Sequence, residues 1–265
     1  MFNSQLPPFE TIEVKVEDQV GTIWLNRPEV HNAFNHVMVN EMITALGVLG
    51  TEKTLKILVI RGRGKSFCSG TDLARMQEVV EFSVEERQKD SLLLASCLQS
   101  IYRFPAPVIS VGHGSVMGGG NGFLAAADFA LCTKNTRFAF TEVTIGLVPA
   151  VISYFIIRRI GIGKARELML SGIPFNGLEA ECWGLVNYAV DEFILDSFVE
   201  SWIELLQKNS LQAMQSTKDF ILQTVKLDEE NEILARAAKA ISQAMISKDG
   251  REGVKAFIEK RIPGW

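Results

Sequence analysis

Histidine and cysteine are both scarce in this sequence of 265 residues. The three histidines are His31, His36 and His113. They do not have the spacing of metal ligands. The four cysteines are Cys68, Cys97, Cys132 and Cys182. They lie far apart and form no CxxC pair, so we expect four reduced thiols and no metal site.

The sequence also lacks an excess of one charge and a long apolar run. Its 27 Lys and Arg are balanced by 31 Asp and Glu, which gives a net charge of −4, and the basic residues are scattered. Nucleic acid is therefore not an expected partner. No charge-free stretch reaches the roughly 20 residues that span a bilayer. Residues 1–8 resemble neither a secretory signal nor a transit peptide, so we expect no membrane partner and a cytoplasmic location.

The hydrophobic pattern that is present predicts an α/β core. Short β-branched segments alternate with amphipathic ones, and Ser83 to Glu86 form a capping box that should open a helix. The predicted strands cover residues 11–16, 21–25, 55–60, 108–111, 129–132 and 137–140, and the predicted helices 34–46, 83–102 and 119–127. We treat residues 1–192 as one α/β core.

Strands disappear after about Phe193, and the rest of the chain is predicted to be helical. The amphipathic stretches cover residues 193–208, 211–225, 230–246 and 251–261. Their apolar stripes must be buried against the core or against a neighbouring subunit. We therefore expect residues 193–265 to mediate oligomerisation while belonging to the same structural unit.

Three segments combine glycines with one carboxylate: residues 65–73, 116–122 and 140–149. The glycines of residues 118–120 open a predicted helix whose first amides have no partner within the helix. Together with an amide after Gly70, such groups can form an oxyanion hole for the enolate of a thioester. A simple tight turn at residues 118–122 is the alternative explanation of the glycine run.

Taken together, the motifs resemble those of the crotonase (enoyl-CoA hydratase/isomerase) superfamily. They comprise Val20 to Pro28 followed by Asn32 and Ala33, then Ser69 to Asp72, Gly118 to Gly120, and Ala256 to Arg261. The resemblance implies a spiral of ββα units, a helical C-terminal trimerisation region, and trimers that often pair into hexamers. It also implies an acyl-CoA substrate, so that coenzyme A enters with the substrate and no separate cofactor is needed.

Carried over residue by residue, the resemblance makes the N–H groups of Thr71 and Gly119 the oxyanion hole and Glu142 the acid/base carboxylate. The remaining residues that it places along the acyl-CoA are Lys65, Ser69, Gly70, Asp72, Leu73, Gly118, Gly122, Pro149, Phe257 and Lys260. Asp72 also fits as the cap of a helix that begins at Leu73. Lys260, with Phe257, would reach the adenine and 3′-phosphate from a neighbouring subunit; a solvated surface lysine is the alternative.

The sequence departs from the family's hydratases at Gly122, where those enzymes usually carry a first glutamate. Glu142 alone would then have to serve as both acid and base. The segment after it, Leu147 to Tyr154, resembles that of bacterial 3-methylglutaconyl-CoA hydratases. We expect a hydro-lyase that adds water to a 2,3-enoyl-CoA. The alternatives are a 3,2-enoyl-CoA isomerase, a carrier-protein-linked dehydratase, or a non-enzymatic acyl-CoA-binding module.

Two further residues near these segments have structural interpretations. Cys68 has no Cys/His relay around it, so we interpret it as a small buried filler. His113 follows a predicted strand, and we interpret it as a turn residue, with proton transfer as the alternative.

Overall fold

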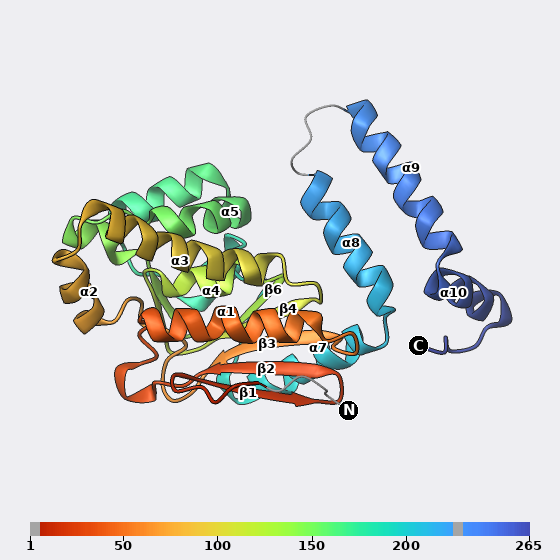
Figure 1. The fold of residues 1–265 in the computed structure, drawn as a ribbon, viewed down its shortest axis with the longest axis horizontal. Coiled ribbons are helices and arrows are strands. Elements are labelled where there is room, and N and C mark those ends of the chain that lie inside the picture. The colour runs from red at the N-terminus through yellow and green to blue at the C-terminus, as the bar shows by residue number, and fades with distance from the viewer. Residues whose placement is uncertain (1–5, 225–229) are drawn as a thin grey trace.

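The computed structural model describes residues 6–224 and 230–265, so the predicted helix end at Val225 lies outside the described residues. A six-stranded sheet runs through the centre of the molecule (Figure 1). In spatial order its strands are β1 (Ile12–Glu17), β2 (Val20–Leu25), β3 (Ile57–Gly62), β4 (Val108–Gly112), β6 (Phe129–Thr133) and β8 (Tyr188–Val190). The β1–β2 pair is antiparallel and the other neighbours are parallel.

The antiparallel hairpin of β1 and β2 confirms the first two predicted strands, residues 11–16 and 21–25. Its two-residue turn places Asp18 at φ 46° and Gln19 at φ 70°. Positive φ at both central residues gives the turn a twist that matches that of the flanking strands. The helix predicted next is α1 (His36–Thr51), which begins later than expected because the Asn35 side chain accepts a hydrogen bond from the Met38 N–H and caps it.

Helices cover both faces of the sheet. On one face α7 (Leu195–Gln207) packs Val199 and Ile203 against alternate residues of the strands, such as Val59 and Val111. On the other face α1, α3 (Val84–Tyr102) and α4 (Gly120–Ala125) cover Ile60. Strands that are buried on both faces are apolar at nearly every position. The sequence of such strands, as in β3 and β4, is therefore a short continuous apolar run.

The remaining elements of the core lie around this sheet and the helices that cover it. A second sheet consists of β5 (Ser115–Met117) and β7 (Arg137–Ala139), paired in parallel. The helices are α2 (Leu73–Val80), α5 (Ala150–Ser171) and α6 (Gly177–Cys182). The predicted capping box of α3 is present, with Ser83 and Glu86 bonding reciprocally. Neither β5 nor β8 was predicted: each has three residues, and its place in a sheet depends on a partner strand distant in the sequence.

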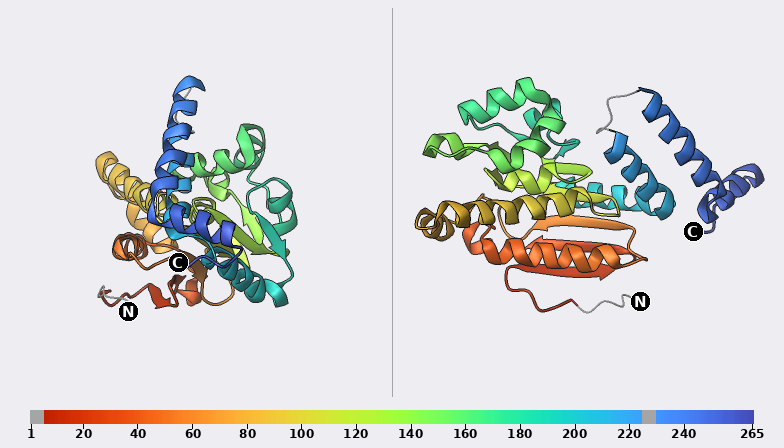
Figure 2. Two further views of the ribbon diagram at one scale, coloured as in Figure 1. Left: turned by 90° about the vertical axis from the view of Figure 1, so that its right-hand side faces the viewer. Right: turned by 45° about the horizontal axis from the view of Figure 1, so that its top comes forward.

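The C-terminal helices α8 (Leu211–Thr224), α9 (Glu230–Ile246) and α10 (Lys248–Glu259) project to one side of the core (Figures 1 and 2). α9 coincides with its prediction, whereas α10 begins three residues early because Ser247 caps it. The exposed apolar side chains of α9 and α10 are Leu234, Ile241, Met245, Ile246, Val254, Phe257 and Ile258, followed by Ile262 beyond the last helix. Within the described ranges, no helix is both long and apolar enough to cross a membrane.

One ion pair, of which the Lys218 side chain is largely buried, ties α8 to the core. Lys218 donates to Asp128 at 2.6 Å and to the carbonyl of Ala106 at 3.3 Å. The same Asp128 carboxylate accepts the Val108 N–H, at the start of β4, at 2.8 Å. The Lys218 side chain is only 10% exposed, so the ammonium depends on this carboxylate for its charge compensation.

We therefore expect Asp128→Asn to lower the free energy of unfolding by roughly 3 kcal/mol, because it leaves a buried ammonium uncompensated. Urea denaturation measures the change. Asp191→Asn is the matched control, since Asp191 pairs with Lys134 at 2.8 Å and the Lys134 side chain, 40% exposed, keeps much more contact with water than that of Lys218. That control should cost less than about 1 kcal/mol. Equal losses in the two variants would contradict the prediction.

Candidate active site

The site is built where two chain segments pair in parallel. The N–H of Cys68 donates to Ser115 at 3.2 Å, and the N–H of Met117 donates to Cys68 at 3.0 Å. Cys68 and Val116 are bridge partners in this short parallel pairing. Three residues further along each segment come Thr71 and Gly119, and both line the same cavity. The pairing therefore brings the two predicted amide donors to one place.

Glycine in the left-handed region precedes each of these donors. Gly70 has φ +96° and Gly118 has φ +46°, conformations that side-chain-bearing residues rarely adopt. Among the described residues, neither the Thr71 N–H nor the Gly119 N–H donates a hydrogen bond. A Cβ on Gly119 would lie 2.8 Å from Cζ of Phe34, so this position also requires glycine. Two free amides beside one cavity are the arrangement that an oxyanion hole needs.

Glu142 lies beside these amides. It belongs to a short 3-10 helix, η2 (Thr141–Ile145), directly after β7. A Cβ on Gly118 would lie 3.4 Å from its Oε1, and its Oε2 is buried with no hydrogen-bond partner among the described residues. Burial raises the pKa of this carboxyl, and a backbone hydrogen bond lowers it less. The raised pKa makes this carboxylate a stronger base than that of an exposed glutamate, which suits it to accept a proton.

The cavity in front of Glu142 has a volume of about 830 Å³. Four predicted residues line it: Thr71, Gly119, Glu142 and Pro149. Most of its wall is apolar and comes from α1, α2, α3 and the segment that leads into α5. The polar exceptions on α2 and α3 include Arg75, Asp90 and Ser91, and Arg75 donates to the Asp90 carboxylate at 2.5 Å. Sequence reasoning missed this α2–α3 wall, which has no motif.

Several other predicted residues lie in the loop before α2 or at its first position, Leu73, and none of them lines the cavity. Lys65 and Leu73 are exposed, and the Ser69 hydroxyl donates to the Val30 carbonyl at 3.2 Å. Asp72 accepts from the Ala74 and Arg75 amides and pairs with Arg27 at 2.7 Å, which confirms the cap. Burial by itself would raise the pKa of Asp72, but these hydrogen bonds and the Arg27 charge together lower it. A contact of these residues with CoA stays a prediction.

Gly122, Phe257 in α10 and Lys260 directly after that helix do not line the cavity. Gly122 is buried inside α4, where an added Cβ would lie 2.7 Å from Cδ1 of Leu98 and 2.8 Å from Cγ2 of Ile152. Phe257 is 85% exposed and, with Lys260, sits at the end of the molecule opposite α2 (Figure 1). Within one chain these two residues therefore do not reach the cavity.

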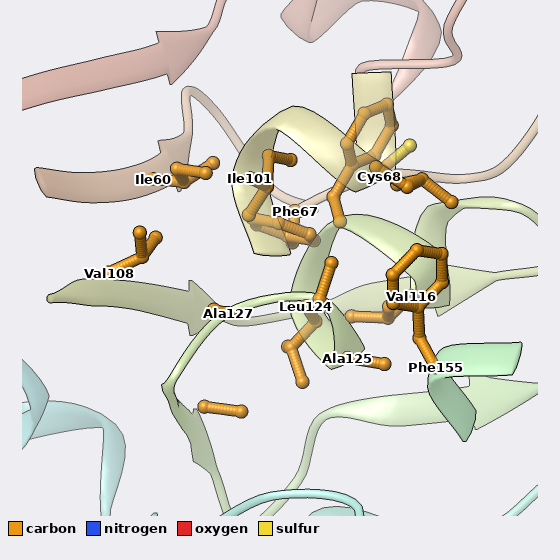
Figure 3. Close-up of a cluster of buried hydrophobic side chains, with 14 of the residues drawn as sticks. Ile60, Phe67, Cys68, Ile101, Val108, Val116, Leu124, Ala125, Ala127 and Phe155 are labelled. Carbon is orange, nitrogen blue, oxygen red and sulfur yellow. The ribbon is translucent and has the colours of Figure 1, made fainter. Parts of the chain in front are cut away.

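The interpretations of Cys68 and His113 agree with their surroundings. Phe67, Cys68, Val116 and Leu124 gather in one buried cluster (Figure 3). Burial raises the pKa of Cys68 to about 12, so the group stays a thiol. The His113 ring bonds to the Gly64 carbonyl at 3.0 Å and does not line the cavity.

The raised pKa of Glu142 predicts a cost in stability at neutral pH. The ionised carboxylate is disfavoured in the folded protein, so the cost develops as pH rises from about 4, where an ordinary Glu titrates, through the raised pKa. Glu142→Gln should therefore raise the urea midpoint at pH 7, and the gain should vanish at pH 4. Glu85→Gln, at an exposed side chain of α3, should show no such gain. A loss of stability at pH 7 would contradict this account.

Comparisons with known proteins agree with this geometry. Residues 15–265 match the family described as "Enoyl-CoA hydratase/isomerase". An enoyl-CoA hydratase structure from Shewanella pealeana superposes with a TM-score of 0.93 at 30% identity, covering 97% of this chain and 96% of that one. A trans-2-decenoyl-[acyl-carrier-protein] isomerase of Streptococcus mutans is 30% identical over 96% of this chain and 97% of its own. A crotonyl-CoA hydratase of Syntrophomonas wolfei is 28% identical over 96% of each. The chain has the crotonase fold and is an enzyme of the enoyl-CoA hydratase/isomerase family.

Proposed function

We propose that the protein adds water across the 2,3-double bond of an enoyl-CoA thioester, with Glu142 as its single acid/base group. The observation that carries the proposal is one half-buried carboxyl with an unpartnered oxygen, in the same cavity as two unpaired amides. The amides are suited to the thioester oxygen, and the carboxyl to the water and the α-carbon.

In the proposed reaction the thioester oxygen accepts hydrogen bonds from the N–H groups of Thr71 and Gly119. Glu142 takes a proton from water as the hydroxyl oxygen bonds to the β-carbon, and the electron pair of the double bond moves to the thioester oxygen. The enolate then collapses, and its α-carbon takes the proton back from Glu142. One carboxyl is sufficient because the proton it removes is the proton it returns, and its raised pKa strengthens it as the base that takes this proton from water.

A double-bond isomerase is the second candidate, and the packing around Gly122 favours it. A second glutamate at this position would have to displace both Leu98 and Ile152. Moving a proton between two carbons needs only one base, and an isomerase is among the relatives with 30% identity. Hydration stays the leading proposal because Glu142 can perform both proton transfers that hydration needs, removal from water and return to the α-carbon.

The acyl group belongs to the same proposal. A cavity of about 830 Å³ has room for a branched chain, and the Arg75–Asp90 pair and Ser91 in its wall offer polar partners to an acyl group that carries a polar end. Together with the sequence resemblance noted above, this supports 3-methylglutaconyl-CoA as a substrate to test first, beside straight-chain 2-enoyl-CoA.

The direction of the absorbance change distinguishes the two functions. With a 2-enoyl-CoA, hydration should remove the conjugated absorbance, whereas isomerisation of a 3-enoyl-CoA should create it. Glu142→Gln should lower kcat by roughly 10²–10⁴-fold in either case while the protein stays folded. Activity on 3-enoyl-CoA alone would replace the hydratase proposal by the isomerase, and tight binding without turnover would favour a binding module. A Gln variant that keeps more than about a tenth of the turnover would require another base.

We further propose that residues 193–265 carry the contacts of a homotrimer or hexamer. The exposed apolar side chains of α9 and α10 form a patch that an isolated subunit would leave in water. A neighbouring copy that covers this patch would also bring Phe257 and Lys260 to a cavity that their own chain cannot reach. Lys260 would then contact a CoA phosphate across the subunit interface.

This arrangement predicts complementation between two defective variants. Lys260→Ala should raise KM roughly 10–100-fold with kcat nearly unchanged, through loss of a charge-assisted contact. Co-expression with Glu142→Gln should restore a low KM, because intact Glu142 and intact Lys260 then meet at some interfaces. Light scattering gives the oligomeric state. A monomer, or mixtures that keep the high KM, would contradict the proposal.

A further inference from the structure

We propose that Asn121 is a positioning residue that fixes the orientation of the Gly119 N–H, and this inference rests on the oxyanion hole of the proposed function. Asn121 does not line the cavity, and the sequence motifs gave it no role. Its side chain is buried, with the residue 1% exposed, on the first turn of α4. It acts through the backbone around it.

The side-chain NH2 of Asn121 lies within hydrogen-bond distance of three carbonyl oxygens, and since it has two hydrogens, one N–H is shared between two of them. Its Nδ2 lies 2.9 Å from Gly118 O, 3.1 Å from Ala139 O and 3.3 Å from Val116 O. Its own Oδ1 is buried and accepts no hydrogen bond from the described residues. Because the Asn121 oxygen accepts no hydrogen bond, it contributes no stabilising interaction. The side chain therefore contributes to the structure through the hydrogen bonds that its NH2 group donates to these carbonyls.

The contact with Gly118 O controls the oxyanion donor. Gly118 C=O and Gly119 N–H belong to one planar peptide unit, so holding the carbonyl on one side directs the N–H to the other. Both flanking residues are glycines, whose backbones rotate with little steric resistance, and this peptide could otherwise turn over easily. The Asn121 backbone N–H also donates to Gly118 O, at 3.1 Å, and adds to the restraint.

The other two contacts connect this peptide to the base. Ala139 is the last residue of β7 and precedes Glu142 by three positions, and its carbonyl also accepts the Gly118 N–H at 2.9 Å. Val116 lies in β5, within the parallel pairing that places the oxyanion segments. One side chain thus joins the strand before Glu142 to the loop before Gly119. The second donor needs no such side chain, because the Phe34 N–H holds the Gly70 carbonyl of its peptide at 2.8 Å.

Two substitutions at position 121 separate positioning from packing. Asn121→Ala removes all three donations, whereas Asn121→Ser keeps a hydroxyl that can reach the carbonyl three residues back, as Ser153 does to Ala150 at 2.7 Å. That carbonyl is Gly118 O. We expect kcat to fall about 10–100-fold in the Ala variant and only about threefold in the Ser variant, with KM changed less than about threefold in both.

Thr136→Val is the matched control. Thr136 is fully buried, its hydroxyl shares a 2.8 Å hydrogen bond with Thr133, and it does not line the cavity. This variant should lose stability, yet keep kcat within about twofold of the unmodified protein when rates are normalised to folded enzyme.

Acetoacetyl-CoA provides a readout that does not depend on which reaction the enzyme catalyses. Its enolate absorbs in the near ultraviolet, and two well-placed amides should stabilise that enolate on binding. The unmodified protein and Asn121→Ser should show the band and Asn121→Ala should lose most of it, while butyryl-CoA binds all three equally. Equal kcat and equal bands in the Ala and Ser variants would overturn the inference. No band in the unmodified protein would overturn the oxyanion hole as well, whereas a band without hydration would overturn only the proposed reaction.

Discussion

The candidate active site depends on the parallel pairing of two short segments around Cys68 and Val116. This pairing supplies only a few backbone hydrogen bonds, yet it brings Thr71 and Gly119 to one cavity from positions 48 residues apart in the chain. The cluster beneath it, which includes Phe67, Cys68 and Leu124, holds the segments against the core (Figure 3). An added Cβ on Gly120 would lie 2.8 Å from the Cys68 carbonyl, so the close approach of α4 to this pairing requires glycine.

Much of the core was predictable because its signals are local. The hairpin turn at Asp18 and Gln19, the Ser83 capping box and the apolar runs of β3 and β4 each depend on residues close together in the sequence. The donor segments and Glu142 were predicted through glycine spacing and family resemblance, and the cavity contains Thr71, Gly119 and Glu142. Their catalytic roles remain proposals.

The parts that could not be predicted are those fixed by distant partners. β5 and β8 have three residues each, and their pairing with β7 and β6 depends on tertiary contacts that no local pattern specifies. Asn121 resembles any polar residue in a helix until the three carbonyls that converge on it are seen. In the sequence, Gly122 stands at a position where related hydratases usually carry a glutamate. Only the packing of Leu98 and Ile152 in the structure indicates that the space for a glutamate is filled as well.

The Thr71 and Gly119 amides have no protein partner among the described residues, and two further groups beside them are held at a cost in stability. The Glu142 Oε2 and the Asn121 Oδ1 are buried and have no hydrogen-bond partner in the described parts of the chain. Each would be better satisfied in water, so the surrounding fold must prevent relaxation. A thioester that develops negative charge on its oxygen would pair with the two amides, and water or the α-carbon would engage the carboxyl. On the proposed mechanism these pairings form as the reaction proceeds, so their free energy lowers the barrier instead of stabilising the empty enzyme.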